Sequence, residues 1–273
     1  MRRIRLTVAY DGTDYCGWQI QPNGITIEEV LNKALFRLTG EPVKVVGASR
    51  TDAGVHALGN TAVFDTDTTI PPERIAYALN RELPADVVAV RSEEVPLGWH
   101  PRRCSSVKTY RYLILNREMP NPLMRRTSWH VSYPLDVERM RQAAQYLTGE
   151  HDFRSFCSVH TEVTDTVRTI YDLDVRRNGE LITILVRGSG FLYNMVRIMA
   201  GTLTEVGRGL RKPENVKEIL EAKEREKAGA TAPPWGLTLM GIEFPTLDGE
   251  GKECGGIEHW TDSKYTGRNP RFS

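Results

Sequence analysis

The sequence predicts an α+β protein built from two ferredoxin-like halves, with antiparallel sheets joined side by side and helices on one face. Two observations predict this class. The element order β-α-β-β-α-β, which defines the ferredoxin-like arrangement, can be read twice along the chain. In addition, 273 residues with a hydrophobic fraction of 40% suffice for one large domain or two modest ones without disulfides or metals.

The first half is expected over residues 1–105. Residues 3–10 alternate between apolar and polar side chains, which predicts a half-buried strand. Apolar residues at helical spacing from Ile27 to Leu38 predict a helix that ends before Gly40. Pro71 and Pro72 open a second helix. The other strands expected in this half are residues 43–46, 61–64 and 87–90.

The second half is expected over residues 106–245 and repeats the order without repeating the sequence. Its expected strands are residues 110–115, 170–176, 181–188 and 237–244, and its expected helices are residues 137–147 and 191–206. Residues 177–180 have the composition of a hairpin turn. Residues 246–273 are rich in glycine and polar side chains and predict a loosely ordered tail.

Composition narrows the class of protein. The net charge is only +1, but arginines and lysines cluster locally, which allows basic patches on a nearly neutral chain. The four cysteines have no metal-knuckle or redox spacing and are expected to be free thiols of a reducing cytoplasm. No apolar run approaches membrane-spanning length, so no membrane partner is expected.

A phosphotransfer motif is only partly present after the first strand. Asp11, Gly12 and Thr13 match the second part of the Asp-x-Asp-Gly-Thr signature of haloacid-dehalogenase-type phosphatases. The nucleophilic aspartate of that signature is replaced by Ala9, so no phosphoaspartate can form. Asp11 and Gly12 are therefore interpreted as a turn.

The segment GASRTDAGVHALGN, residues 47–60, carries the candidate chemistry. In an extended segment Arg50 and Asp52 would point the same way, and the arginine would favour an ionised carboxylate while burial opposes it. A surface ion pair in a turn is the plain alternative. His56 is interpreted as a structural histidine rather than a base.

This segment resembles the signature of the TruA family of tRNA pseudouridine synthases, in which the aspartate is catalytic. Further blocks resemble that family in the same order over residues 3–245: YDGTDYCGWQ from Tyr10, KTYRY from Lys108, HDFRSF from His151, FLYNMVR from Phe191 and APPWGLTL from Ala232. The resemblance implies a cleft between the halves that holds the active site.

The resemblance implies that the chain isomerises uridine to pseudouridine at positions 38, 39 and 40 of the tRNA anticodon stem-loop. It implies Asp52 as the catalytic carboxylate, and Tyr110, Arg50, Arg197 and Leu239 as substrate-binding residues. Arg197 on an apolar helix needs a partner, which a phosphate or Asp52 would supply. The implied partners are tRNA and a second copy of the chain, and no metal or cofactor is expected.

Two other functions stay open at this point. One is an RNA-binding module without catalysis, although the aromatic surface strand of RNA-recognition domains is absent from the sequence. The other is a nucleoside hydrolase that uses the same carboxylate to activate water. The three functions differ in their products: pseudouridine, nothing, or free base.

Overall fold

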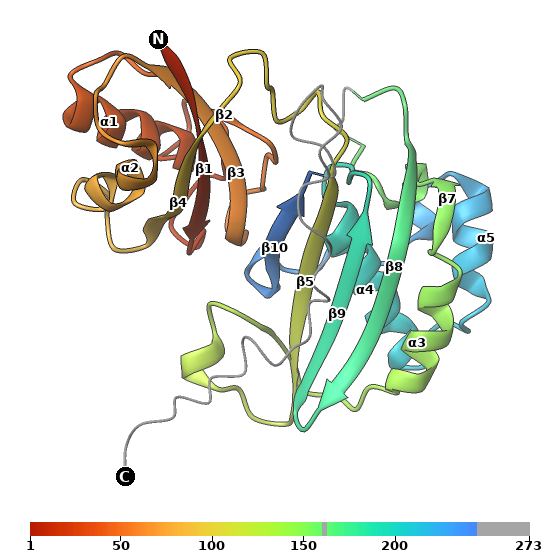
Figure 1. Ribbon diagram of the computed structural model, residues 1–273. Helices are drawn as coiled ribbons and strands as arrows, with labels where there is room; N and C mark the ends of the chain where they lie inside the picture. The colour runs from red at the N-terminus through yellow and green to blue at the C-terminus, as the bar shows by residue number, and fades with distance from the viewer. Residues whose placement is uncertain (160–162, 245–273) are drawn as a thin grey trace.

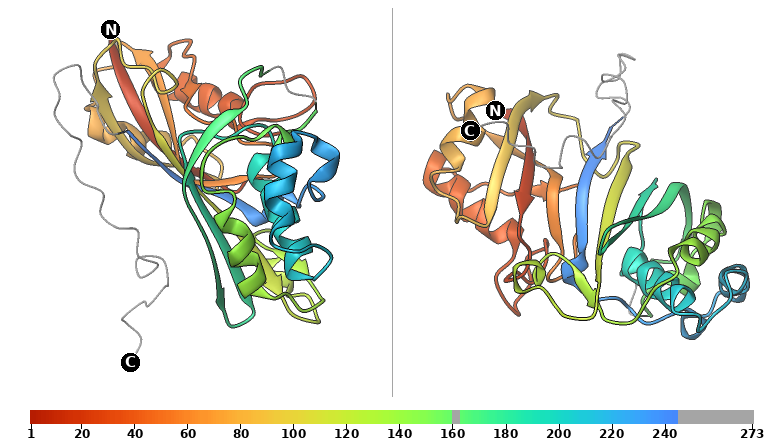
Figure 2. Two further views of the ribbon diagram at one scale, coloured as in Figure 1. Left: turned by 90° about the vertical axis from the view of Figure 1, so that its right-hand side faces the viewer. Right: turned by 90° about the horizontal axis from the view of Figure 1, so that it is seen from below.

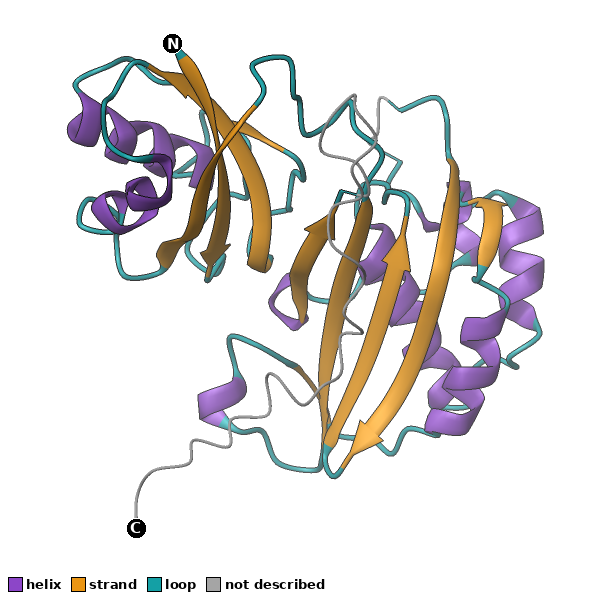
Figure 3. Cartoon of the chain, viewed as in Figure 1, coloured by secondary structure: helices purple, strands orange, loops and turns teal. Residues whose placement is uncertain are grey.

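The computed structural model describes residues 1–159 and 163–244, and in these ranges the chain is a mixed α+β protein built on one large sheet (Figure 1, Figure 3). The sheet has ten strands in the order β4-β1-β3-β10-β5-β9-β8-β7, with β2 beside β3 and β6 beside β5. The predicted α+β class is confirmed.

The strands have the following bounds. They are β1 (Arg2–Tyr10), β2 (Val46–Gly47), β3 (His56–Thr66), β4 (Val87–Val95), β5 (Val107–Asn116), β6 (Trp129–Val131), β7 (Gly149–Asp152), β8 (Val167–Asn178), β9 (Leu181–Gly188) and β10 (Leu237–Glu243). Every predicted strand overlaps one of these, whereas β6 and β7 were not predicted. The turn between β8 and β9 is the predicted hairpin, and Gly179 takes a positive φ of 59° there.

The described helices are α1 (Ile27–Thr39), α2 (Pro72–Leu79), α3 (Val137–Gln145), α4 (Met195–Gly207) and α5 (Asn215–Ala222). Helix α1 shows why its bounds could be predicted. The side chain of Thr26 accepts a hydrogen bond from the Glu29 amide at its start, and Gly40 ends it with a φ of 73°. The first three helices lie where the apolar spacing predicts them, and α5 was not predicted.

Two predicted elements are shorter in the structure. Helix α4 begins at Met195 and not at residue 191, because Asn194 has a left-handed backbone that no helix continues through. The strand predicted over 43–46 is reduced to Val46 and Gly47, since the amide of Val45 donates to the side chain of Asn32 and not to a neighbouring strand.

The sheet is continuous because β10 pairs with β5 in antiparallel fashion and with β3 in parallel fashion. The expectation of purely antiparallel pairing is therefore wrong at this junction, and also between β5 and β6, which pair in parallel. Directly paired residues share a face, and one such row crosses six strands. The row consists of Tyr10, Ala57, Leu239, Tyr110, Val186 and Leu173.

All six side chains of this row are buried, and they belong to the main core between the sheet and the helices. The helices cover this face of the sheet in both views of Figure 2. A smaller apolar cluster, which includes Val63, Trp99 and Phe244, packs separately. The sheet junction at Leu239 therefore lies under the protein's main core.

Some predictions lie outside the described residues. The polar tail over 246–273 and Cys254 belong to this undescribed part. Among the described residues, Cys16, Cys104 and Cys157 are not joined in disulfide bonds, as expected. None of the helices within 1–159 and 163–244 is long and apolar enough to cross a lipid bilayer.

Candidate active site

Asp52 lies in the loop between β2 and β3, above the sheet junction. The loop turns back on itself there, since the Val55 amide donates to the carbonyl oxygen of Asp52 at 3.1 Å and Gly54 has a φ of 76°. The loop packs on the row of buried side chains described above, and this placement brings residues of β1 and β5 under it.

Two glycines of the YDGTDYCGWQ block hold the loop from outside. A Cβ on Gly12 would stand 2.0 Å from the Val55 carbonyl oxygen, and one on Gly17 would stand 2.6 Å from the Thr51 carbonyl oxygen. The neighbouring amide of Trp18 donates to the Thr51 oxygen at 3.0 Å. Only glycine permits such close backbone contact, so this block fixes the position of the loop.

A buried hydrogen-bond network supports the loop from below. The Tyr10 hydroxyl bonds Thr51 Oγ1 at 2.7 Å, and Asn60 Nδ2 donates to that hydroxyl at 3.2 Å and to the Ser49 carbonyl at 3.0 Å. Ser49 Oγ in turn bonds the Tyr110 hydroxyl at 2.9 Å. Local patterns in the sequence do not indicate Ser49, Asn60 and Tyr10, because the side-chain partners that join them to other strands and to Thr51 lie 41 to 61 residues away in the chain.

The Asp52 carboxylate is mostly buried and faces one guanidinium. Its side chain is 19% exposed, and Arg197 Nη1 lies 3.7 Å from its Oδ2. Burial raises the pKa of Asp52 from 3.8 to about 6, and the charge of Arg197 partly opposes this rise. The group is therefore largely ionised at pH 7, but it is held in a poorly solvated place.

The expected pairing of Arg50 with Asp52 is wrong. Arg50 is exposed, and its guanidinium makes no ion pair with Asp52 or with any other described residue. The segment around Asp52 turns instead of running extended, so the two side chains do not share a face. The partner of Asp52 is Arg197, for which the sequence suggested either a phosphate or Asp52.

Arg197 is itself held by two acceptors. Its Nε donates to the Ala232 carbonyl oxygen at 2.8 Å, and its Nη1 donates to Asn194 Oδ1 at 2.7 Å. The amide of Ala232 returns a bond to the Arg197 carbonyl at 3.1 Å. The FLYNMVR and APPWGLTL blocks thus meet here, and both serve the same guanidinium.

Tyr110 lies under the loop and beside Leu239. Its ring packs edge-on against Phe191, with ring centroids 5.1 Å apart, and only 6% of it is exposed. Burial and the Asp52 charge raise the pKa of Tyr110 to about 12, against the Ser49 hydrogen bond that lowers it. The phenol is therefore protonated at neutral pH. Leu239 is fully buried beneath the same loop.

His56 and Asp11 have structural roles, as the sequence analysis expected. His56 Nδ1 accepts from the Gly12 amide at 3.0 Å, and its Nε2 lies 3.1 Å from the Trp235 carbonyl oxygen. Asp11 Oδ1 accepts from the amide of Thr13 at 3.0 Å, which forms the predicted turn. Both ring nitrogens of His56 are occupied, so it has no free position for proton transfer.

Basic side chains gather beside the loop. Lys108 Nζ donates to the carbonyl oxygen of Ala48 at 3.3 Å, next to Ser49. Burial lowers the pKa of Lys108, and the charges of Arg168 and Arg102 lower it further. Lys108 of β5, Arg168 of β8 and Arg102 before β5 thus lie close enough to influence one another, and they form a positive patch that reaches the loop at Ala48.

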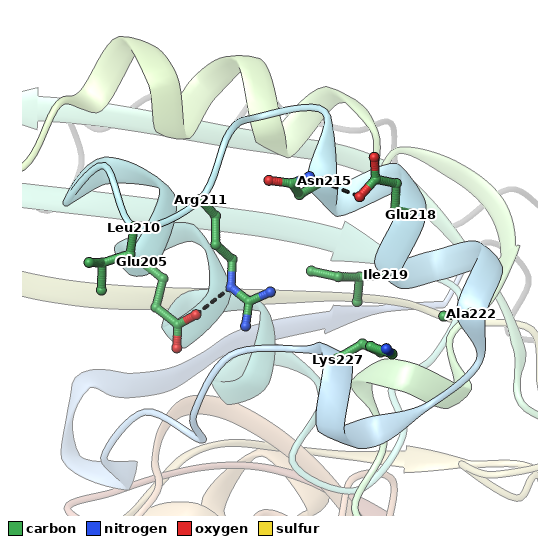
Figure 4. A pocket seen from close by; sticks show the side chains of 8 residues that line it. All are labelled: Glu205, Leu210, Arg211, Asn215, Glu218, Ile219, Ala222 and Lys227. Carbon is green, nitrogen blue, oxygen red and sulfur yellow. Dashed lines mark hydrogen bonds and ion pairs between the residues drawn. The ribbon is translucent and has the colours of Figure 1, made fainter.

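A separate open pocket of about 610 Å³ lies by α4 and α5, away from Asp52 (Figure 4). Its lining residues are Glu205, Leu210, Arg211, Asn215, Glu218, Ile219, Ala222 and Lys227. Arg211 donates to Glu205 at 2.6 Å and Asn215 donates to Glu218 at 2.8 Å, so much of its polar lining is internally paired. Within the described ranges, no three His, Cys, Asp or Glu side chains are grouped as metal ligands.

Comparison with known proteins gives a consistent result. A family model described as tRNA pseudouridine synthase matches residues 6–102 and 143–245. Curated proteins called tRNA pseudouridine synthase A are similar over 89% of this chain and 100% of their own length. They include those of Thermoanaerobacter sp. strain X514, 50% identical, Brevibacillus brevis, 49% identical, and Geotalea uraniireducens, 46% identical.

Proposed function

This chain belongs to the tRNA pseudouridine synthase family, and on that premise we propose that it isomerises uridine in tRNA with Asp52 as the catalytic carboxylate. The observation that carries the proposal is the mostly buried Asp52 carboxylate, 3.7 Å from Arg197, on a loop fixed from both sides. The target uridines are positions 38, 39 and 40 of the anticodon stem-loop, as the family resemblance implies.

The reaction leaves the atomic composition of the nucleotide unchanged. The bond from ribose C1′ to uracil N1 breaks, the uracil turns, and C1′ bonds to C5. The proton of C5 then leaves to solvent, and N1 takes up a proton in place of its lost bond to C1′. Positive charge develops at C1′ when the first bond breaks, and an ionised Asp52 can stabilise it or attack covalently. Addition to C6 of the base and deprotonation of the sugar are two further routes open to the same carboxylate.

The other predicted residues have separate tasks. Arg197 favours the ionised form of Asp52 despite its burial. Tyr110, protonated and fixed by Ser49, positions the base, or relays the C5 proton to solvent by giving up its own hydroxyl proton as it accepts the other. Leu239 forms the apolar floor beneath them. Arg50 is exposed beside Asp52 and is free to contact a tRNA phosphate.

The tRNA is bound through its backbone by the patch of Lys108, Arg102 and Arg168, and through its shape. The target uridine leaves the stack to reach Asp52, which costs a few kcal/mol that pocket contacts offset. A cleft between ferredoxin-like halves over 1–105 and 106–245 receives it. The strand orders β4-β1-β3-β2 and β10-β5-β9-β8 support this division into halves. A homodimer and a cytoplasmic location complete the proposal.

The experiment is to incubate the protein with unmodified tRNA tritiated at C5 of uracil. The proposal expects tritium release to water, with pseudouridine mapped to positions 38, 39 or 40. Release of free uracil would show a hydrolase instead. Tight tRNA binding with neither product would show a binding module.

A further inference from the structure

Asn194 has an unusual backbone at the start of α4. It is one of two non-glycine residues with positive φ in the described part of the chain, with φ 61° and ψ 6°. An L-residue in the left-handed region is held there against a local cost, which asparagine bears better than other side chains. Such positions concentrate at functional sites, so the conformation needs an explanation.

The side chain of Asn194 stands at the N-cap of α4 but does not make the usual N-cap hydrogen bond. An asparagine at a helix N-cap normally accepts a hydrogen bond from an amide of the first turn. Here it caps no amide, although the first turn of α4 contains no acidic side chain to replace it. Its Oδ1 accepts instead from Arg197 Nη1 at 2.7 Å, three residues further along the helix.

The same Nη1 atom is the one that lies 3.7 Å from Asp52 Oδ2. The Ala232 carbonyl binds only the Nε–H of Arg197, so the planar guanidinium as a whole could still tilt about this single hydrogen bond. A second acceptor on Nη1 removes that freedom. The side chain of Asn194 thus determines where the positive charge stands relative to Asp52.

We propose that Asn194 is a positioning residue, whose left-handed backbone aims its amide oxygen so that Arg197 keeps Asp52 ionised. The inference rests on the proposed function of Asp52. Asp52 is faced by Arg197 from α4 and by Tyr110 from β5, and Arg50 of its own loop is exposed. Among the described residues, Arg197 is the one whose charge favours the ionised carboxylate.

The test is the pH dependence of kcat/KM for pseudouridine formation, which reports groups of the free enzyme. Asn194→Gly keeps the left-handed backbone and a tolerated N-cap but removes the acceptor. On the acid side of this profile, called the acid limb, kcat/KM rises with pH, and its midpoint in wild type is expected at about pH 6. If the midpoint moves to about pH 7 in the variant, kcat/KM at pH 6 falls about fivefold, and the difference from wild type shrinks toward pH 8. Affinity for tRNA, measured by filter binding, should change less than twofold.

Lys223→Gly is the matched control. Lys223 is the other non-glycine residue with a left-handed backbone in the described ranges, with φ 55°, and it ends α5 far from Asp52 in the sequence. Its replacement should leave the limb in place. Asn194→Ala is a second variant without the acceptor, and it should shift the limb in the same direction as Asn194→Gly.

Three results separate the claims. An active wild-type enzyme whose Asn194→Gly and Asn194→Ala variants keep the wild-type limb would overturn the positioning role alone. An equal shift in Lys223→Gly would also overturn it, because the effect would then be general to the helices. A wild-type protein that forms no pseudouridine would overturn the proposed function itself.

Discussion

Replacing Asp52 by asparagine should change the stability of the protein in a way that depends on pH. The carboxylate is mostly buried, and burial raises its pKa from 3.8 to about 6. Ionising such a group costs folding free energy, whereas the asparagine amide cannot ionise. The variant therefore lacks a cost that the wild-type protein bears at neutral pH.

The sign and size of the effect follow from proton linkage. Between pH 3.8 and pH 6 the folded protein holds the Asp52 proton and the unfolded chain has lost it, so wild-type stability falls as pH rises through this window. The difference of 2.2 units corresponds to about 3 kcal/mol, fully present above pH 6. Between pH 4.5 and pH 8 the variant should gain about 2 kcal/mol relative to wild type.

The assay is equilibrium urea unfolding of both proteins at pH 4.5, 6 and 8. Asp65→Asn is the matched control, because Asp65 pairs with Arg3 at 2.7 Å and this hydrogen bond lowers its pKa. Its carboxylate gains its stabilising contribution as pH rises to the unfolded pKa of 3.8, so from pH 4.5 to pH 8 the stability difference between this variant and wild type should be nearly constant. An Asp52→Asn difference that also stays constant over this range, or that falls as pH rises, would refute the reasoning.

Three further predictions concern catalysis and binding. Arg197→Met removes the charge that favours ionised Asp52, so the acid limb of kcat/KM should move up by about one to three pH units; an unmoved limb would exclude the ion pair. Tyr110→Phe removes the hydroxyl that bonds Ser49, so kcat should fall while the far-UV circular dichroism stays unchanged. If the variant keeps the wild-type kcat, Tyr110 has only a packing role. The affinity for tRNA should fall steeply between 50 and 200 mM salt, and a salt-independent Kd would contradict phosphate binding by the basic patch.

Local patterns in the sequence predicted the elements of this fold well. Strand alternation and helical spacing depend on neighbouring residues, so β1 and α1 lie close to their predicted bounds. The same reasoning failed at Phe191, where an apolar run does not begin a helix. Phe191 packs on Tyr110 from a loop, and only the left-handed Asn194 decides where α4 starts.

The site was predicted in part for the same reason. Asp52 and Arg197 belong to recognisable blocks, and a charge on an apolar helix indicated that Arg197 needs a partner. Which arginine faces Asp52 depends on how the loop turns. The prediction from the sequence favoured Arg50 because it treated the segment from Arg50 to Asp52 as extended. Likewise, the bond between Ser49 and Tyr110 joins residues 61 apart and has no local signature.

The most direct test of the account is single-turnover pseudouridine formation by wild type, Asp52→Asn and Asp65→Asn, with tRNA binding measured in parallel. The account predicts that Asp52→Asn binds tRNA with nearly wild-type affinity and forms no detectable pseudouridine, while Asp65→Asn turns over at a rate near wild type. Turnover by Asp52→Asn at a rate comparable to wild type would contradict it.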